Sequence, residues 1–140
     1  MNIISDSREQ ILIFKETNIA KLDEGDYTTN KLLNKFHIER KSGEDLYGSI
    51  IQGHARFRRE IVRAITKKIK LVVYVECSRS DFILKKFKQG YKRKMPSATL
   101  STIIDTMAKK YDLEFVFCNS RDDMRIMMIQ RFKLEESKLD

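Results

Sequence analysis

An acid and a base occupy alternate positions in the first third of the chain, at Glu39 and Lys41. The preceding run Phe36–Arg40 has apolar Phe36 and Ile38 at the alternating positions of a β-strand. Because successive side chains of a strand point to opposite faces, Glu39 and Lys41 share one face. Charged groups are costly to bury unless they are paired or bound to a ligand. This spacing therefore predicts a binding or catalytic site.

A second carboxylate, Asp26, follows Gly25 in the stretch that leads to this strand. The stretch Ala20–Arg40 is predicted to form two strands joined by a polar loop, which would let Asp26 approach Glu39. Neighbouring carboxylates repel each other unless a proton or a cation lies between them, and hard oxygen ligands suit Mg²⁺. With Lys41 beside the metal to orient water and neutralise phosphate charge, these residues predict metal-assisted phosphodiester hydrolysis.

Each of these residues also has an ordinary structural explanation. An aspartate after glycine, as at Asp26, is typical of a turn. Ser42 and Asp45 form a capping box for the next helix, a role at least as well supported for Asp45 as a catalytic one. Asp6 fits a strand-end residue paired with Arg8. The combination of these residues, more than any one of them, favours a catalytic site.

Composition restricts the class of partner. The chain has 140 residues, 41% of them hydrophobic, and a formal net charge of +8. This composition predicts one basic globular domain with an anionic partner, either nucleic acid or a membrane surface. No apolar run approaches the roughly 18–20 residues of a membrane span, and the opening residues lack the pattern of a signal peptide. Cys77 and Cys118 have no CxxC partner. We therefore expect an intracellular protein that is not secreted and has no membrane partner. Its compartment would be the cytoplasm of a prokaryotic host, or the cytoplasm or nucleus of a host cell.

The elements that must position the site follow from hydrophobic periodicity. Strands are predicted at Asn2–Ser5, Ile19–Leu22, Phe36–Arg40, Leu71–Glu76 and Glu114–Cys118. Helices are predicted at Asp45–Ile51, Ala55–Lys68, Ala98–Tyr111 with Ser97 as its cap, and from a Ser120–Asp123 capping box to about Phe132. This order predicts an α/β domain over residues 1–134, with a mixed central sheet flanked by helices and a frayed polar tail at 135–140.

Three segments together resemble the nuclease domain of the XPF/Hef family of structure-specific endonucleases. Gly25-Asp26, a gap and Glu39-Arg40-Lys41-Ser42-Gly43-Glu44-Asp45 match its GD…ERKxxxD signature. Asp6-Ser7-Arg8-Glu9 is similar to its upstream D-x-R-E strand, and the segments 45–53 and 54–60 are similar to its following helix. The resemblance spans roughly Ile3 to Phe132. Within the family, the chain is most similar to stand-alone versions carried by phages and mobile elements.

The resemblance implies a restriction-endonuclease-like, PD-(D/E)xK fold and a metal-dependent DNA endonuclease of repair or recombination. It makes Asp26 and Glu39 metal ligands, with the Arg40 carbonyl as a third ligand. Lys41 becomes the catalytic lysine, Asp6 a supporting acid and Asp45 a motif residue of open role. The cofactor would be Mg²⁺, with Mn²⁺ able to substitute. Branched or flap-like DNA is the implied substrate, although the appended helical modules that select branches in larger relatives have no room here.

Two basic segments are candidates for DNA contact. Lys85–Lys94 holds six basic residues interleaved with two aromatic residues, and includes Lys92, Arg93 and Lys94. It could grip the phosphate backbone, or it could be a solvated surface loop. An arginine-rich helix face at Arg56 and Arg59 is the second candidate. Within the motif segments, Arg8 and Arg40 are predicted to contact DNA as well.

Two alternatives to an active nuclease remain. The chain could be a DNA-binding module without cleavage activity, or a subunit that needs a partner. XPF-like partners without activity lose the GD or ERK carboxylates, and all of these are present here, which favours the enzyme. A homodimer or a protein partner stays open, because methionines 107, 124, 127 and 128 could line a helical interface. Ordinary core packing is the better explanation for most of these methionines.

Overall fold

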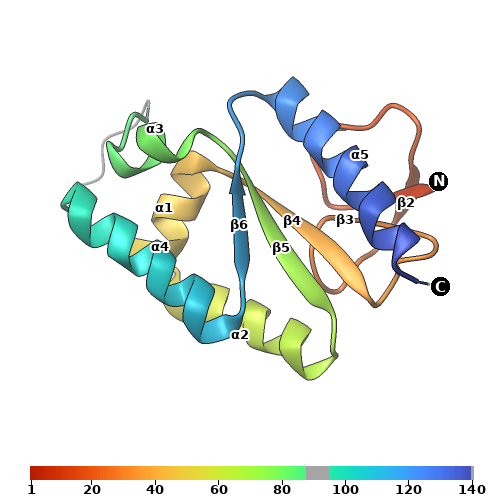
Figure 1. Cartoon of the computed structure of the whole chain (residues 1–140), viewed down its shortest axis with the longest axis horizontal. Helices are drawn as coiled ribbons and strands as arrows, with labels where there is room; N and C mark the ends of the chain where they lie inside the picture. Colours follow the sequence, from red (N-terminus) through yellow and green to blue (C-terminus); the bar gives the residue numbers. More distant parts are fainter. Residues whose placement is uncertain (88–94, 140) are drawn as a thin grey trace.

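The computed structural model describes residues 1–87 and 95–139 and contains a six-stranded mixed sheet (Figure 1). The strand order is β2-β1-β3-β4-β5-β6. The strands are β1 Ile3–Asp6, β2 Asn18–Ala20, β3 Tyr27–Thr29, β4 Phe36–Ser42, β5 Lys70–Glu76 and β6 Glu114–Phe117. β3 is antiparallel to β1 and β4, whereas the pairs β1–β2, β4–β5 and β5–β6 are parallel. The predicted mixed sheet flanked by helices is confirmed.

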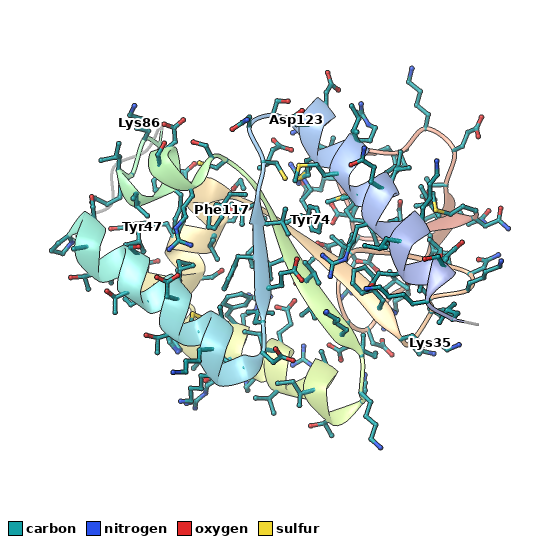
Figure 2. The ribbon with its side chains drawn as sticks, in the orientation of Figure 1. Lys35, Tyr47, Tyr74, Lys86, Phe117 and Asp123 are labelled. Carbon is teal, nitrogen blue, oxygen red and sulfur yellow. The ribbon has the colours of Figure 1, made fainter. Side chains whose placement is uncertain are left out.

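Helices cover both faces of this sheet, and for this reason β5 is almost entirely apolar. The helices are α1 Gly43–Ile51, α2 His54–Thr66, α3 Arg79–Ile83, α4 Ser97–Tyr111 and α5 Arg121–Ser137. Tyr74 packs in the core beneath α5, whereas Val75 and Phe117 pack in the core formed with α1 to α4 (Figures 1 and 2). Alternate β5 side chains therefore fill two separate cores.

The structure corrects the predicted region before β4. The sequence predicted two strands here. In the structure a third strand, β3, lies between them along the chain and pairs with β4. Gly25 starts the turn into β3 with φ +72°, where a Cβ would lie 3.1 Å from the Ile38 carbonyl oxygen. Only glycine adopts this conformation without strain. The turn ends at Asp26, which is thereby placed beside β4.

Other predicted boundaries also shift. Ser97 is the first residue of α4 and not its cap, because Pro96 occupies the N-cap position. The short helix α3 was not predicted. Helix α5 continues past Phe132 to Ser137, so residues 135–137 are helical and not frayed. Glu135 is buried, and Glu136 accepts a 2.6 Å hydrogen bond from the Thr29 hydroxyl on β3. These contacts hold the last turn of the helix against the sheet.

A buried histidine on β4 makes the fold sensitive to acid. His37 Nδ1 donates to the Glu24 carbonyl at 2.6 Å, and His37 Nε2 accepts from the Asn34 amide at 2.9 Å. These two hydrogen bonds require the neutral ring, and burial lowers the pKa of His37 below 6.5. As the pH falls, the His37 side chain of the unfolded chain is therefore protonated at a higher pH than that of the folded chain. The contribution of His37 to stability is complete above pH 6.5 and is lost as pH falls through its folded-state pKa.

We expect His37→Ala to lower the free energy of unfolding by about 1–3 kcal/mol at neutral pH, because it leaves the buried Glu24 carbonyl and the Asn34 amide without the ring that bonds both. The difference between wild type and variant should shrink as the pH is lowered toward 5. Urea unfolding at several pH values measures this difference. His54→Ala, which changes the exposed second histidine, is the matched control. A difference that stays constant with pH would contradict a neutral, buried His37.

Candidate active site

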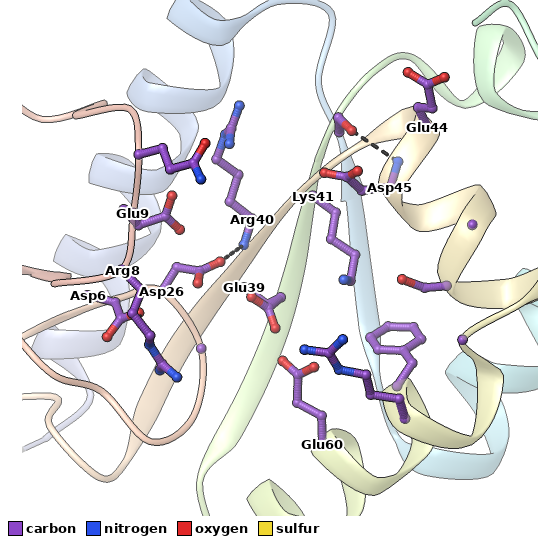
Figure 3. A pocket seen from close by; sticks show the side chains of 18 of the residues that line it. Asp6, Arg8, Glu9, Asp26, Glu39, Arg40, Lys41, Glu44, Asp45 and Glu60 are labelled. Atoms are coloured by element: carbon purple, nitrogen blue, oxygen red, sulfur yellow. Dashed lines mark hydrogen bonds and ion pairs between the residues drawn. The ribbon is translucent and has the colours of Figure 1, made fainter. Parts of the chain in front are cut away.

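A cleft of about 1240 Å³ lies over the C-terminal part of β4 and is bordered by α1, α2 and the loop after β1 (Figure 3). Asp6, Asp26, Glu39 and Lys41 all line it. Asp6 ends β1 and Asp26 precedes β3, while Glu39 and Lys41 lie on one face of β4. The structure thus brings together the four residues on which the sequence-based site was built.

The Asp26 carboxyl shares the cleft with the carboxyls of Glu39 and Glu9, and both influence its pKa. Its Oδ2 atom also accepts a 2.8 Å hydrogen bond from the Arg40 amide, which fixes the carboxyl against β4. Burial first, and then the contact with Glu39, raise the pKa of Asp26 to about 9. Burial and mutual repulsion therefore favour the protonated form of Asp26 and of the neighbouring Glu9 near neutral pH, unless a cation neutralises them.

Glu9 is a site residue that the sequence analysis did not assign. Its amide donates to the Asp6 carbonyl at 3.1 Å, so residues 6–9 form a turn. This turn brings the Glu9 carboxyl into the cleft. Burial, followed by the charge of Asp26, raises the pKa of Glu9 to about 8. The sequence did offer a signal. In the spacing Asp-x-x-Glu at the end of a strand, a turn places the second acid close to the first.

Asp6 is largely occupied by local contacts. Its Oδ1 accepts from the Leu22 amide and its Oδ2 from Arg8 Nε, both at 2.8 Å. Arg8 also donates to the Leu22 carbonyl at 2.6 Å. Although burial opposes it, these hydrogen bonds give Asp6 a net lowered pKa. Asp6 is therefore a charged group that fixes the loop beside Asp26.

Lys41 projects across the cleft toward α2. Its Nζ lies 5.0 Å from the ring centroid of Phe57, a buried α2 residue. The cation–π contact holds the ammonium group over the ring without neutralising its charge. Lys41 is therefore placed on the same side of β4 as Glu39, with its charge directed into the cleft (Figure 3). Phe57 was not identified as a site residue from the sequence.

Comparison with known proteins gives the family. Residues 6–128 match the model of the ERCC4 domain. The chain belongs to the ERCC4-domain family. The fold is similar to that of XPF from Aeropyrum pernix, with a TM-score of 0.75 and 15% identity over 99% of this chain and 67% of that one. XPF from the same organism in complex with DNA matches with a TM-score of 0.72, 14% identity and the same coverage. A search of curated proteins gives no significant match.

Arg40 of this ERCC4 domain points away from the cleft centre, toward the end of β5. Its guanidinium donates to Glu76 at 3.1 Å, and Glu76 also accepts hydrogen bonds from Arg121 at 3.0 and 3.2 Å. The two arginines lower the pKa of Glu76 against the opposing effect of burial. The side chain of Arg40 is thus held by Glu76, while its backbone amide holds Asp26.

The remaining predicted site residues line the edges of the ERCC4-domain cleft. The Asp45 amide donates to Ser42 Oγ at 3.0 Å, so the predicted cap of α1 is present. The Asp45 side chain is exposed at the cleft border. Arg56 and Arg59 line the α2 wall, and Arg8 lines the opposite wall. Lys92, Arg93 and Lys94 lie outside the described residues. Among residues 1–87 and 95–139, no helix is long and apolar enough to cross a membrane.

Proposed function

We propose that this chain is a divalent-metal-dependent DNA endonuclease. The observation that carries the proposal is the grouping of the Asp26 and Glu39 carboxyls with Lys41 in one cleft, where Glu39 and Lys41 share a face of β4. Membership of the ERCC4-domain family and the fold shared with a DNA-bound XPF structure support DNA as the substrate.

The donor groups fit a hard divalent cation such as Mg²⁺ or Mn²⁺. Asp26, Glu39 and the backbone carbonyl of Arg40 would hold it. Within the described part of the chain, no three His, Cys, Asp or Glu side chains are arranged to hold a metal alone, so water and DNA phosphate oxygens would complete the coordination, as is common for Mg²⁺. When bound, such a cation polarises the scissile phosphate and makes a bound water molecule more acidic.

The chain's own residues would then position the reactants. Lys41, held over Phe57, would orient the attacking water and neutralise charge on the phosphate. The Arg40 amide would keep the Asp26 carboxylate in a fixed orientation. Glu9 would remain a neighbouring acid that can hold a proton close to the reacting groups. Asp6 and Arg8 would keep the loop in place beside them.

The test is a cleavage assay on end-labelled linear, flap, fork and junction DNAs with Mg²⁺, with Mn²⁺ and with EDTA. We expect cleavage of at least one DNA with either metal and none with EDTA. Binding without any cleavage would instead favour a DNA-binding module or a subunit that needs a partner.

The α2 arginines provide the proposed phosphate contacts. Arg56 and Arg59 are exposed and lie on the cleft wall opposite the acids. If each contacts one phosphate of duplex DNA, changing both to alanine should make the slope of log K against log salt shallower by about 1.8. Affinity measured at several salt concentrations checks this. The pair Lys109→Ala and Lys110→Ala at the end of α4 removes the same charge away from the cleft and should leave the slope nearly unchanged.

The same measurement applies to the proposed basic loop. Changing Lys92, Arg93 and Lys94 to alanine should flatten the salt slope and leave turnover at saturating DNA near normal, if the loop contributes affinity and not chemistry. An unchanged salt slope would show that the loop does not contact DNA phosphates and is only solvated surface.

A further inference from the structure

The walls of the cleft differ strongly in charge. On the side of the β1 loop and the turn before β3, the lining residues include four acids and one arginine: Asp6, Arg8, Glu9, Asp23 and Asp26. On the α2 side they include three arginines and one glutamate: Arg56, Arg59, Glu60 and Arg63. A nucleic acid backbone is attracted to the α2 wall and repelled by the acids wherever no cation covers them. We therefore expect a bound strand to lie with its phosphates along α2.

An exposed apolar segment lies on the acidic side of the same cleft. Ile11 lines the cleft directly after Glu9 and Gln10 and is 45% exposed, and the next residue, Leu12, is 60% exposed. The following two residues of this apolar run are buried, Ile13 at 1% and Phe14 at 3%. The sequence Ile11–Phe14 thus divides into an exposed half and a buried half. Large aliphatic side chains in this position favour an apolar ligand surface over a phosphate.

The buried half fixes the exposed half in place. The Ile13 carbonyl accepts a 2.6 Å hydrogen bond from Arg125 Nε on α5. Phe14 packs edge-to-face on Tyr27 of β3, with ring centroids 5.3 Å apart. Tyr27 is the first residue of β3 and directly follows Asp26, so packing couples this apolar segment to the strand next to the proposed metal ligand. The buried half therefore anchors the loop, so that the exposed Ile11 lines the cleft and the exposed Leu12 directly follows it.

We propose that Ile11 and Leu12 form an apolar platform for an unpaired or unstacked base next to the cleaved phosphate. With phosphates on α2, the bases of the strand point toward this platform. Intact duplex keeps its bases paired and stacked, whereas a branch or a frayed end offers a free base face to an apolar side chain. Ile11 and Leu12 are thereby specificity-determining residues for branched over continuous DNA. This inference rests on the proposed DNA endonuclease function.

Binding in EDTA tests the platform separately from cleavage. The probes are a fork and a continuous duplex of equal length, each with 2-aminopurine at the position that is unpaired in the fork. We expect wild type to bind the fork more tightly and to change its 2-aminopurine fluorescence. Ile11→Ser with Leu12→Ser should reduce the preference for the fork by about tenfold, in line with the loss of one buried aliphatic contact. Duplex affinity should change little.

Matched variants complete the design. Ile126→Ser with Leu134→Ser removes two equally exposed aliphatics on α5, neither of which lines the cleft, and should leave the preference intact. Leu12→Met keeps an apolar side chain of similar volume and should retain it as well. Thermal melts establish that all variants fold.

The outcomes separate the two proposals. A wild type that fails to distinguish fork from duplex, or a serine variant that keeps the preference and the fluorescence change, overturns the platform. A wild type that shows the fluorescence change and the platform-dependent preference but cleaves no DNA with Mg²⁺ or Mn²⁺ overturns the nuclease proposal and leaves the platform supported.

Discussion

Asp26→Asn is expected to reduce cleavage by at least about a hundredfold, because one preorganised charge or metal contact is worth several kcal/mol in the transition state. The substitution keeps the shape of the side chain and its hydrogen bond from the Arg40 amide. It removes the negative charge that would hold the cation together with Glu39. DNA affinity measured in EDTA should hold steady or rise, since a carboxylate near a phosphate is repulsive without a cation.

Lys41→Ala should cause a loss of similar size for a different reason. It removes the ammonium group over Phe57 that would orient water and screen the phosphate. Binding should weaken only slightly, through one phosphate contact. Cleavage and binding are measured on the same labelled DNA. Asp105→Asn on α4 is the matched control for the aspartate change, because its carboxylate is 70% exposed and pairs with Arg79.

Binding that falls in step with cleavage in both variants would contradict catalytic roles and would point to a purely electrostatic contribution or to misfolding. Normal cleavage by Asp26→Asn would contradict the proposed metal site.

The parts of this fold that could be predicted from the sequence are those in which one pattern dominates. The apolar run of β5 predicts a strand covered on both faces, and the capping residues Ser42 and Ser120 predict the starts of α1 and α5, where each accepts a hydrogen bond from the expected amide. The close approach of Asp26 to Glu39 was expected from the spacing of the motif. The alternation of Glu39 and Lys41 placed both in one cleft.

The parts that could not be predicted depend on contacts between distant residues. β3 has only three residues, and it is a strand because β1 and β4 flank it on both sides. The last turn of α5 looks polar in sequence, yet Thr29 on β3 binds Glu136 and fixes it. The role of Glu9 emerges only when the turn after β1 brings it to Asp26. A single sequence carries no signal for such long-range pairs beyond weak local spacing.

The carboxyl cluster should make stability depend on both pH and divalent metal. The pKa of Asp26 rises from 3.8 to about 9 on folding and that of Glu9 from 4.5 to about 8, with burial as the largest cause of each. The folded chain therefore binds more protons than the unfolded chain between these limits. The stability contributed by these groups is complete below about pH 4 and is lost as pH rises through the folded-state pKa values.

A divalent cation that binds the deprotonated cluster should reverse this loss. In EDTA, we expect the melting temperature of wild type to fall between about pH 6 and pH 9, and that of Asp26→Asn to fall less. Metal at about a hundred times its Kd stabilises the folded state by about 2.7 kcal/mol, or roughly 10 °C for a chain of this length. Because metal and protons compete for the same oxygens, the shift should be larger near pH 9 than near pH 6.

Thermal unfolding with Mn²⁺ or EDTA at each pH measures this linkage without any DNA. Asp26→Asn should lose most of the metal-induced shift, whereas Asp105→Asn should keep all of it. If Asp26→Asn and wild type respond equally to metal, the cation binds elsewhere and the carboxyl cluster is only a proton-holding feature of the cleft. If neither responds, while DNA cleavage still requires Mn²⁺ or Mg²⁺, the cation enters together with the phosphate, and the coordination supplied by the chain alone is too weak to stabilise the fold.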